Sequence, residues 1–512
     1  MPLGRAFAVA LIGLNGHLVE VEADIGQTLP NFVLLGLPDS SLHEARERIR
    51  SAAQNTGLPL SRRKLTVNLI PATLPKSGSG FDLAICLAAL RAAGDVNDTG
   101  RTVFLAELSL DGRLRPVTGI LPAVMAAVAA GYRRIVVARG NEHEAALVPG
   151  AEVLAFNTLA QVALHFGADP QRLALEDQPE PEASPPVAAD AGPVRDLSEV
   201  AGQADARFGL EVAAAGAHHL LMVGPPGAGK TMLAERLPTI LPPLTDAEAM
   251  EVTAIHSLAG RGAPRLDLIR RAPYENPHHT ATVVSVVGGG SGMPRPGAAT
   301  RAHRGVLFLD EAPEFDRRVM DALRQPLEDG RLVVHRAAGA ADYPARFQLV
   351  LAANPCPCGQ DGVKGAQCRC TSLERRRYAS RMSGPVLDRV DVRLDVPRVS
   401  LREMNSTEPA ESSARVAVRV AAARGAQGER LQRYGVTTNA EVPGRVLRGP
   451  LHPGRSSTRE LELAMERSLM TARGHDRVLR LAWTLADLTG HPVPDADDVG
   501  QALMFRERRA VA

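Results

Sequence analysis

The sequence predicts an α/β protein with a parallel β-sheet at its centre, a separate domain before the sheet and a helical domain after it. Three short apolar runs, at residues 220–223, 306–309 and 347–352, are typical of buried parallel strands, and helix-length segments separate them. A Pro-rich acidic stretch from Glu176 to Asp196 is typical of an extended linker. Beyond about Ser412, apolar residues recur at helical spacing, which predicts a small helical bundle.

Composition limits the classes of protein to consider. The chain has 512 residues, enough for about three domains. No apolar run reaches about 18 residues and the N-terminus lacks a long apolar signal core, so we expect a cytoplasmic protein without a membrane span. The net charge of +2 excludes a strong whole-protein attraction to polyanions, so any nucleic-acid contact has to be local.

A phosphate-binding loop follows the first strand-like run. In this pattern the glycines let backbone N–H groups surround a triphosphate, Lys230 reaches the outer phosphates and the Thr231 hydroxyl binds Mg²⁺. The flanking strand-like and helix-like runs argue against a chance glycine-rich turn. We therefore expect ATP and Mg²⁺ as cofactors. The predicted loop consists of Gly224, Pro225, Pro226, Gly227, Ala228, Gly229, Lys230 and Thr231.

The second strand-like run, Val306 to Leu309, ends in two carboxylates, Asp310 and Glu311. This is a Walker B pattern, in which Asp310 holds the Mg²⁺ shell together with Thr231, and Glu311 orients or deprotonates the attacking water. A helix cap after a core strand is the weaker alternative. The two patterns together predict hydrolysis of ATP rather than binding alone.

Four of the five cysteines form two Cys-x-Cys pairs with nine residues between the pairs. In a reducing compartment, four thiolates in this arrangement indicate a structural Zn²⁺ site, although the spacing within each pair is tighter than usual. Buried free thiols and a redox switch are the alternatives, and catalysis is disfavoured because no histidine accompanies the cysteines. The four residues are Cys356, Cys358, Cys368 and Cys370.

The order of these motifs resembles an AAA+ ATPase. The segments Tyr274–Thr280 (YENPHHT), Val287–Ser291 (VGGGS), Pro294–Gly297 (PRPG) and Ser383–Asp391 (SGPVLDRVD) resemble, more narrowly, the YifB/ComM family of the magnesium-chelatase-like branch. The resemblance covers essentially the whole chain. It implies a Lon-protease-like domain at 1–172, the linker at 173–195, the AAA+ core at 196–411 and a helical lid at 412–512.

The resemblance also assigns roles to three polar residues of the core and the lid. Asn354 matches the sensor that bonds the attacking water or the γ-phosphate, although the spacing alone fits an Asn-Pro turn equally well. Arg389 matches an arginine finger that a neighbouring subunit supplies. Arg473 matches the second sensor. A finger that acts between subunits implies a ring of identical chains, expected to be a hexamer.

Other arginines compete for these two assignments. Arg377 and Arg381 are alternatives for the finger, and Arg389 itself could be part of a surface ion pair with Asp388 or Asp391. Arg477 and Arg480 lie at neighbouring helical positions and are alternatives for the second sensor.

The first domain resembles the proteolytic domain of Lon-type proteases, over Leu65–Leu87 and Val103–Ala138. The positions of the catalytic serine and lysine, however, hold Gly80 and Leu121. A Ser-Lys mechanism needs both a hydroxyl and an amine, so we expect an inactive protease fold used for assembly or substrate contact. A shifted dyad of Lys76 with Ser77 or Ser79 is the minor alternative.

The resemblance implies a motor that drives branch migration of DNA in recombination and natural transformation. Candidate DNA contacts are the basic residues before the Gly-rich insert, and a predicted hairpin from Arg331 to Tyr343. A chelatase motor is an alternative, although neither a porphyrin-binding segment nor a membrane partner is expected; an AAA+ scaffold that remodels proteins is another. The candidate side chains are Arg270, Arg271, His278, His279, His335 and Arg336.

Overall fold

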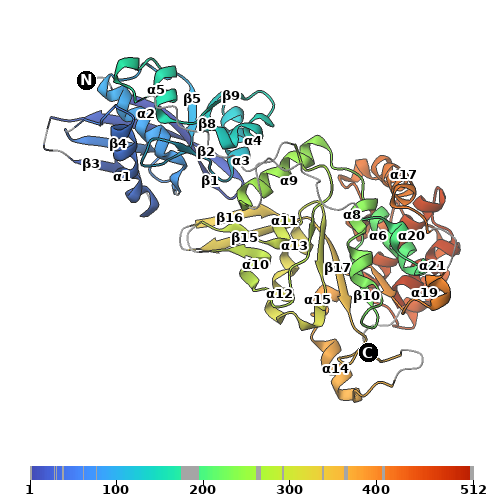
Figure 1. The fold of residues 1–512 in the computed structure, drawn as a ribbon. Coiled ribbons are helices and arrows are strands. Elements are labelled where there is room, and N and C mark those ends of the chain that lie inside the picture. The colour runs from blue at the N-terminus through green and yellow to red at the C-terminus, as the bar shows by residue number, and fades with distance from the viewer. Residues whose placement is uncertain are drawn as a thin grey trace.

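The computed structural model divides into an N-terminal α/β part, a central part built on a parallel sheet, and a group of C-terminal helices (Figure 1). Residues 175–194 of the predicted linker lie outside the described residues. The structure describes residues 3–27, 29, 31–36, 40–61, 63–76, 78–174, 195–260, 267–290, 293–336, 339–362, 367–405 and 410–507.

The N-terminal part is a mixed seven-stranded sheet with helices. In spatial order the strands are β3 (Phe32–Leu35), β4 (Leu65–Ile70), β2 (Asn15–Ile25), β1 (Gly4–Ile12), β5 (Thr102–Leu105), β8 (Arg134–Ala138) and β9 (Glu152–Phe156). The helices are α1 (Ser40–Asn55), α2 (Asp82–Ala93), α3 (Ile120–Ala129), α4 (Glu142–Ala146) and α5 (Leu159–His165), and a short hairpin joins β6 (Glu107–Leu108) to β7 (Leu114–Arg115).

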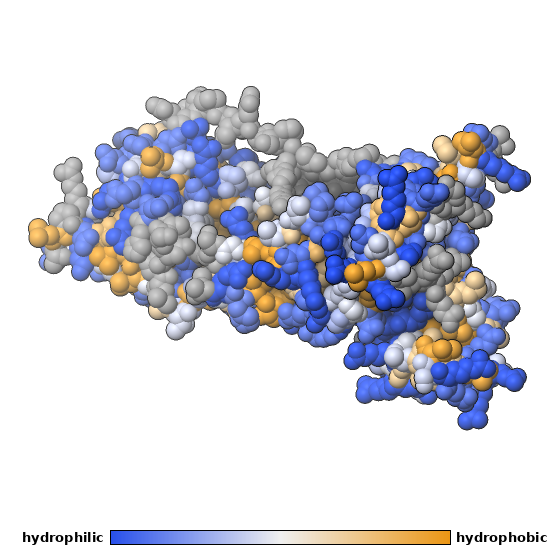
Figure 2. All heavy atoms as spheres, turned by 90° about the horizontal axis from the view of Figure 1, so that it is seen from below, coloured by the Kyte–Doolittle hydropathy of each residue, from blue (hydrophilic) through white to orange (hydrophobic). Residues whose placement is uncertain are grey.

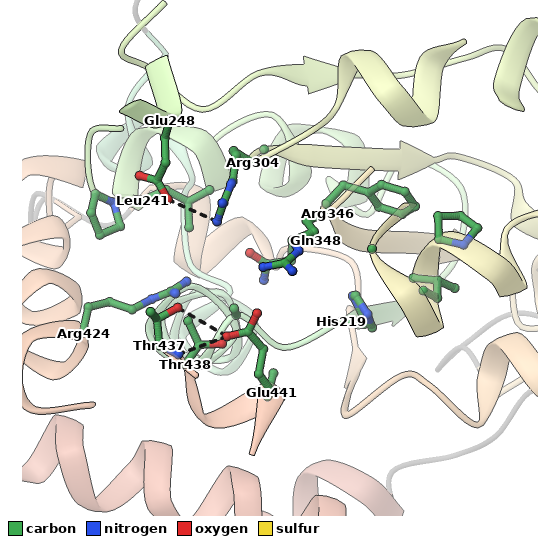
Figure 3. A pocket seen from close by; sticks show the side chains of 18 of the residues that line it. His219, Leu241, Glu248, Arg304, Arg346, Gln348, Arg424, Thr437, Thr438 and Glu441 are labelled. Carbon is green, nitrogen blue, oxygen red and sulfur yellow. Dashed lines mark hydrogen bonds and ion pairs between the residues drawn. The ribbon is translucent and has the colours of Figure 1, made fainter. Parts of the chain in front are cut away.

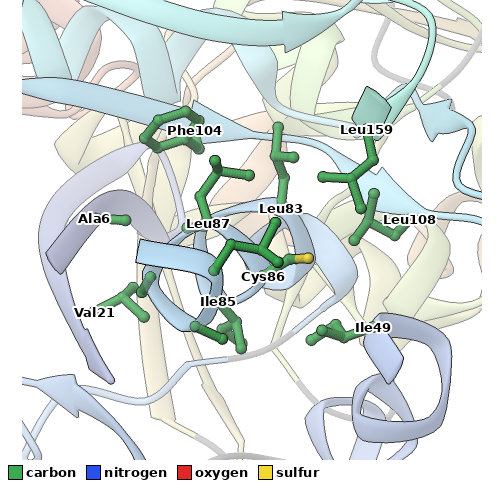
Figure 4. Close-up of a cluster of buried hydrophobic side chains, with 14 of the residues drawn as sticks. Ala6, Val21, Ile49, Leu83, Ile85, Cys86, Leu87, Phe104, Leu108 and Leu159 are labelled. Carbon is green, nitrogen blue, oxygen red and sulfur yellow. The ribbon is translucent and has the colours of Figure 1, made fainter. Parts of the chain in front are cut away.

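Helix α2 forms the centre of the N-terminal core. It packs against β1, β2 and α1, so that residues on almost every side of it are buried, including Leu83, Cys86 and Leu87. Figure 4 shows these side chains together with Phe104 of β5 and Leu159 of α5. Burial of apolar surface stabilises such a cluster by about 25 cal/mol per Å². The absence of an amphipathic pattern in α2 thus follows from its central position.

The central part is a five-stranded sheet in which every strand pair is parallel. Its order is β11 (Tyr274–Glu275), β14 (Val306–Leu309), β17 (Gln348–Ala353), β10 (Leu220–Val223) and β18 (Val392–Asp395). The three strand-like runs of the sequence are the adjacent strands β14, β17 and β10, so the predicted parallel core is confirmed. Their complete burial agrees with their lack of polar alternation.

Helices surround this sheet. They are α6 (Ala204–Gly216), α7 (Lys230–Ala234), α8 (Leu237–Ile240), α9 (Asp246–Ala259), α10 (Val283–Val287), α11 (Ala298–Arg301), α12 (Arg317–Ala322), α13 (Arg324–Asp329), α14 (Ser372–Ser380), α15 (Gly384–Leu387) and α16 (Leu401–Met404). Two hairpins extend from this part. One joins β12 (Gly288–Gly289) to β13 (Arg295–Pro296), and the other joins β15 (Arg331–Arg336) to β16 (Gly339–Pro344) as predicted from the sequence.

The C-terminal helices pack against one end of the central part. They are α17 (Ser413–Leu431), α18 (Gly444–Leu447), α19 (Arg455–Glu466), α20 (Ala472–Thr489) and α21 (Ala496–Glu507). Helix α20 contacts α6, α17 and α21. Its Trp483 is buried, donates its indole N–H to the Leu451 carbonyl at 2.9 Å, and lies beneath the Arg430 guanidinium. The helical tail predicted from the sequence is confirmed.

The N-terminal part is docked on the central part through α3 and α9 (Figure 1). The backbone N–H of Gly119 bonds the Ser257 carbonyl at 3.1 Å, and Ala254 of α9 belongs to the same apolar cluster as Leu121. At a second contact, Leu14 of the β1–β2 turn packs on the cluster that contains Tyr343 of the β15–β16 hairpin. The hairpin is therefore held between both parts.

Charged and polar residues cover most of the face seen in Figure 2, and apolar residues occur there in small separate groups. Among the described residues, no helix is both long and apolar enough to cross a membrane.

Candidate nucleotide site

The predicted phosphate loop lies at the carboxyl ends of β10 and β17, between β10 and α7. Gly227 and Gly229 have φ values of +75° and +90°, a region that residues with a Cβ adopt only with strain. Gly224 is required for a different reason, since a Cβ there would lie 2.1 Å from the Val396 carbonyl oxygen. The loop geometry thus accounts for all three of its glycines.

Lys230 occupies the centre of this loop. Its buried ammonium donates to the carbonyls of Gly224 and Pro225, at 2.6 and 3.1 Å, and to Asn354 Oδ1 at 3.2 Å. Burial lowers the pKa of Lys230, while the nearby charges of Asp310 and Glu311 oppose this effect. A buried ammonium whose hydrogen bonds within the described residues are all to neutral oxygens is well suited to an anionic ligand.

The Walker B acids reach the same site from β14. Asp310 accepts a hydrogen bond from Thr231 Oγ1 at 2.6 Å and another from the backbone N–H of Glu311 at 2.9 Å. Mg²⁺ prefers hard oxygen ligands at close range, and the hydroxyl and carboxylate side by side fit that requirement. Glu311 has φ of +52°, a backbone conformation that is uncommon for a residue with a side chain.

His279 contacts Glu311, and this contact was not predicted from the sequence. Its Nδ1 lies 3.1 Å from Glu311 Oε2, and both side chains are partly exposed. His279 was predicted from the sequence as a candidate DNA contact, and in the structure it lies at the nucleotide site. Of the same group, Arg270 pairs with Asp246 at 2.7 Å, whereas the rings of His278 and His279 are tilted by 34° with their centroids 4.1 Å apart.

The neighbouring strands β10 and β18 are parallel, so their amino ends share one edge of the sheet and their carboxyl ends the other. Arg389 precedes β18, whereas the phosphate loop follows β10. Arg389 therefore lies at the edge opposite the phosphate loop. Its guanidinium donates to the Pro385 carbonyl at 2.6 Å and pairs with Glu328. Burial lowers its pKa, and the nearby charges of Arg477 and Arg473 lower it further. The two predicted arginines are therefore close to each other, and within the described ranges no hydrogen bond or ion pair links either one to the phosphate loop.

The side chains of three of the four competing arginines have partners of their own. Arg477 pairs with the buried Asp391 at 2.6 Å, Arg480 donates to the Val442 carbonyl at 2.8 Å, and Arg381 pairs with Glu314 at 2.8 Å. Arg473 follows Thr471, which caps the N-terminus of α20. Its guanidinium makes no such bond within the part of the chain that the structure describes.

Asp391 fixes the segment that carries Arg389. It accepts from His218 Nδ1 at 3.0 Å as well as from Arg477, and His218 Nε2 lies 2.7 Å from Thr484 of α20. Burial alone would raise the pKa of Asp391, but the His218 hydrogen bond and the Arg477 charge hold it well below its usual value. This buried network joins the C-terminal helices to the sheet.

Comparison with known proteins agrees with this architecture. The chain is 48% identical to an uncharacterized protein of Mycobacterium tuberculosis over 100% of both chains. It is 38% identical to YifB of Escherichia coli, over 99% of this chain and 97% of that one, and 37% identical to the competence protein ComM of Haemophilus influenzae, over 99% and 98%. The chain belongs to the YifB/ComM family of magnesium-chelatase-like AAA+ proteins. The family is one of AAA+-like ATPases that use a nucleotide and Mg²⁺.

Family models match three segments of this YifB/ComM chain. They describe magnesium chelatase subunit ChlI at residues 196–404, subunit ChlI of Mg-chelatase at 21–141 and the C-terminal part of ChlI at 410–506. Shorter matches are to a magnesium-chelatase 38 kDa subunit of Rhodobacter capsulatus, 26% identical over 32% of this chain, and to a Lon protease of Salinispora arenicola, 28% identical over 31% of it.

The residue at the position of the Lon catalytic lysine, Leu121, and the residues of the alternative dyad make structural contacts in this protein. Leu121 is fully buried at the junction with α9, and its backbone N–H points to Ser257 Oγ at 3.4 Å. Lys76 is buried and donates to the carbonyls of Gly36, Pro71 and Leu74, at 2.5 to 2.9 Å. Ser79 bonds Glu107 rather than Lys76, and Ser77 lies outside the described residues.

The four clustered cysteines come together directly after Asn354. Their sulfur atoms all lie within 4.8 Å of one another. The backbone N–H groups of Arg369 and Gln360 donate to Cys358 and lower the pKa of its thiol to about 6. Cys86, the fifth cysteine, is far from this cluster in the sequence and is buried in the N-terminal core.

A cavity of about 570 Å³ lies at the amino ends of the strands, away from the phosphate loop (Figure 3). His219 precedes β10, and Gln348 is the first residue of β17. Both line the cavity, together with Arg304, Arg424 and Glu441. Glu328, the partner of Arg389, also lines this cavity. The nucleotide site and this cavity are thus at opposite edges of the same sheet.

Proposed function

We propose that this protein hydrolyses ATP within a ring of identical chains and uses the energy to move branched DNA, as in branch migration during recombination and natural transformation. The observation that carries the ATPase part is the convergence of Lys230, Thr231, Asp310, Glu311 and Asn354 at one edge of the sheet. The competence protein ComM, which matches the chain over nearly its full length, supports the DNA part.

Each side chain has one role in the proposed reaction. Lys230 binds the outer phosphates, and Asn354 aligns the γ-phosphate or the attacking water. Glu311 takes the proton of that water, and the contact with His279 positions the Glu311 carboxylate. Mg²⁺, held by Thr231 and Asp310, would neutralise charge on the phosphates.

A neighbouring chain completes the site in this proposal. The parallel strands β10 and β18 have four residues each and span about 10 Å, so Arg389, at the amino end of β18, and the nearby Arg473 lie away from the phosphate loop of their own chain. We infer that both arginines face the nucleotide of the next subunit. The ring, which we propose to be a hexamer, would be built from the core at 196–411 and the helical domain at 412–512. Domain 1–172 would lie outside this ATPase unit, and the linker at 173–195 would join it to the core.

The β15–β16 hairpin is the proposed DNA contact. Its inward side chains, Val334 and Tyr343, pack against neighbouring elements, whereas His335 and Arg336 near its tip are exposed. The Arg336 guanidinium lies over Gly289 of the second hairpin, where an added Cβ would meet it at 2.6 Å. Two adjacent hairpins with a basic side chain at their contact are suited to the phosphates of a DNA strand in the pore of a ring.

The experiment is steady-state ATP hydrolysis with no polymer, single strands, duplex, forked DNA, four-way junctions and unfolded polypeptide. We expect stimulation by DNA, greatest with branched forms, and no hydrolysis by Lys230→Ala. Arg336→Ala should lose most of the stimulation, whereas Arg331→Ala, on the same strand but paired with Asp342, should retain it. Stimulation by polypeptide alone would instead favour a protein-remodelling scaffold. The absence of stimulation by either polymer would leave the chelatase motor as the remaining alternative.

A further inference from the structure

The four clustered cysteines have the geometry of a metal site. Cys356 Sγ lies 3.4 Å from Cys358 Sγ and 3.7 Å from Cys368 Sγ, and the latter two sulfurs are 3.7 Å apart. Zinc bound to thiolates at about 2.3 Å places tetrahedral ligands about 3.8 Å apart, whereas a disulfide requires about 2.05 Å. We propose that Cys356, Cys358, Cys368 and Cys370 bind one structural Zn²⁺.

The donor set selects both the metal and its role. Four soft sulfur ligands in a tetrahedral arrangement favour Zn²⁺ over Mg²⁺ or Ca²⁺, which require oxygen. Four protein ligands leave no open position for water or substrate, so the ion is structural rather than catalytic. Binding releases the thiol protons to solvent, and no oxidant or reductant is needed.

The proposed ion would join residues 356–358 to residues 368–370 beside the nucleotide site. Gly359, next to Cys358, is so close to the phosphate loop that an added Cβ would lie 2.4 Å from Pro226 Cδ. Asp361 pairs with Arg375 of α14 at 2.6 Å. Tyr378, also on α14, hydrogen-bonds the backbone of Asn354. The metal would therefore fix a small lobe that supports Asn354 and the phosphate loop from one side.

This inference does not depend on DNA or on hydrolysis. The test is the zinc content of the full chain, purified under reducing conditions without added metal and measured by inductively coupled plasma mass spectrometry. We expect about one zinc per chain. The double variant Cys358→Ser/Cys370→Ser should contain less than about a tenth of that amount. The matched control Cys86→Ala, whose cysteine is buried in another domain, should keep the full amount.

A second measurement applies even where the double variant fails to fold. The wild-type chain is treated with a mercurial reagent that displaces thiolate-bound metal, and the released zinc is followed with a coloured chelator. We expect release of about one equivalent, and replacement by Co²⁺ should give the absorption of a tetrahedral tetrathiolate site. Wild-type protein without zinc, or with disulfides between these cysteines, would overturn the proposal.

Discussion

Replacing Glu311 with Gln separates hydrolysis of ATP from its binding. Among the described residues, the hydrogen bond or ion pair of the Glu311 carboxylate is to His279, at 3.1 Å, whereas Thr231 and Lys230 bond other groups. Gln has nearly the same shape and keeps the backbone hydrogen bond to Asp310. We therefore expect the phosphate loop to remain intact in this variant.

The magnitudes follow from these contacts. A positioned general base contributes about 10²- to 10⁴-fold to the rate, so hydrolysis should fall by that factor. ATP affinity should be equal or greater, because the variant removes a negative charge that lies close enough to raise the pKa of Lys230. His279→Ala removes only a partly exposed contact with Glu311, worth about 0.2 to 1 kcal/mol, and should change the rate by less than about fivefold.

The assay is single-turnover hydrolysis of radiolabelled ATP, with affinity measured by titration of a fluorescent ATP analogue. The reasoning predicts a Glu311→Gln protein that binds ATP and retains it. It is refuted if this variant keeps more than about a tenth of the wild-type rate, or if it loses ATP binding altogether.

Three further outcomes follow from the same contacts. Lys230→Ala should weaken ATP binding by about 10- to 150-fold, the value of one charged hydrogen bond, as measured by the same titration; unchanged affinity would contradict its role. Asp391→Ala should lower the free energy of unfolding by about 3 to 5 kcal/mol in urea titrations, since Arg477 and His218 lose a buried partner. The pKa of Asp391 is held below its ordinary value of 3.8, so its contribution is complete above that pH and is lost as the pH falls through the folded-state pKa. A stability difference that disappears between pH 8 and 5 would contradict this assignment. Finally, mixing Arg389→Ala chains with Lys230→Ala chains should restore part of the ATPase that each lacks alone, whereas no recovery in intact rings would exclude a role between subunits.

The phosphate loop and the strands could be predicted because their signals are local. Glycines at fixed spacing determine the turn at 224–231, and uninterrupted apolar runs determine β10, β14 and β17. The hairpin from Arg331 to Pro344 was equally clear, because the residues of its two strands are close in the sequence.

The contact between His279 and Glu311 could not be predicted in this way. His279 follows β11 and Glu311 follows β14, and only the parallel pairing of Tyr274 with Val306 places both strand ends at one edge. The same holds for Leu121. The sequence showed that it replaces a catalytic lysine, whereas its docking on Ser257 depends on how two domains meet.

Branch migration of a labelled, mobile four-way DNA junction tests the central claim most directly. Wild-type protein with ATP and Mg²⁺ should convert the junction into its duplex products, and neither Glu311→Gln nor wild-type protein without ATP should do so. An immobile junction of the same arm lengths should remain intact. If wild-type protein hydrolyses ATP at full rate and leaves the mobile junction unchanged, the proposed function is wrong.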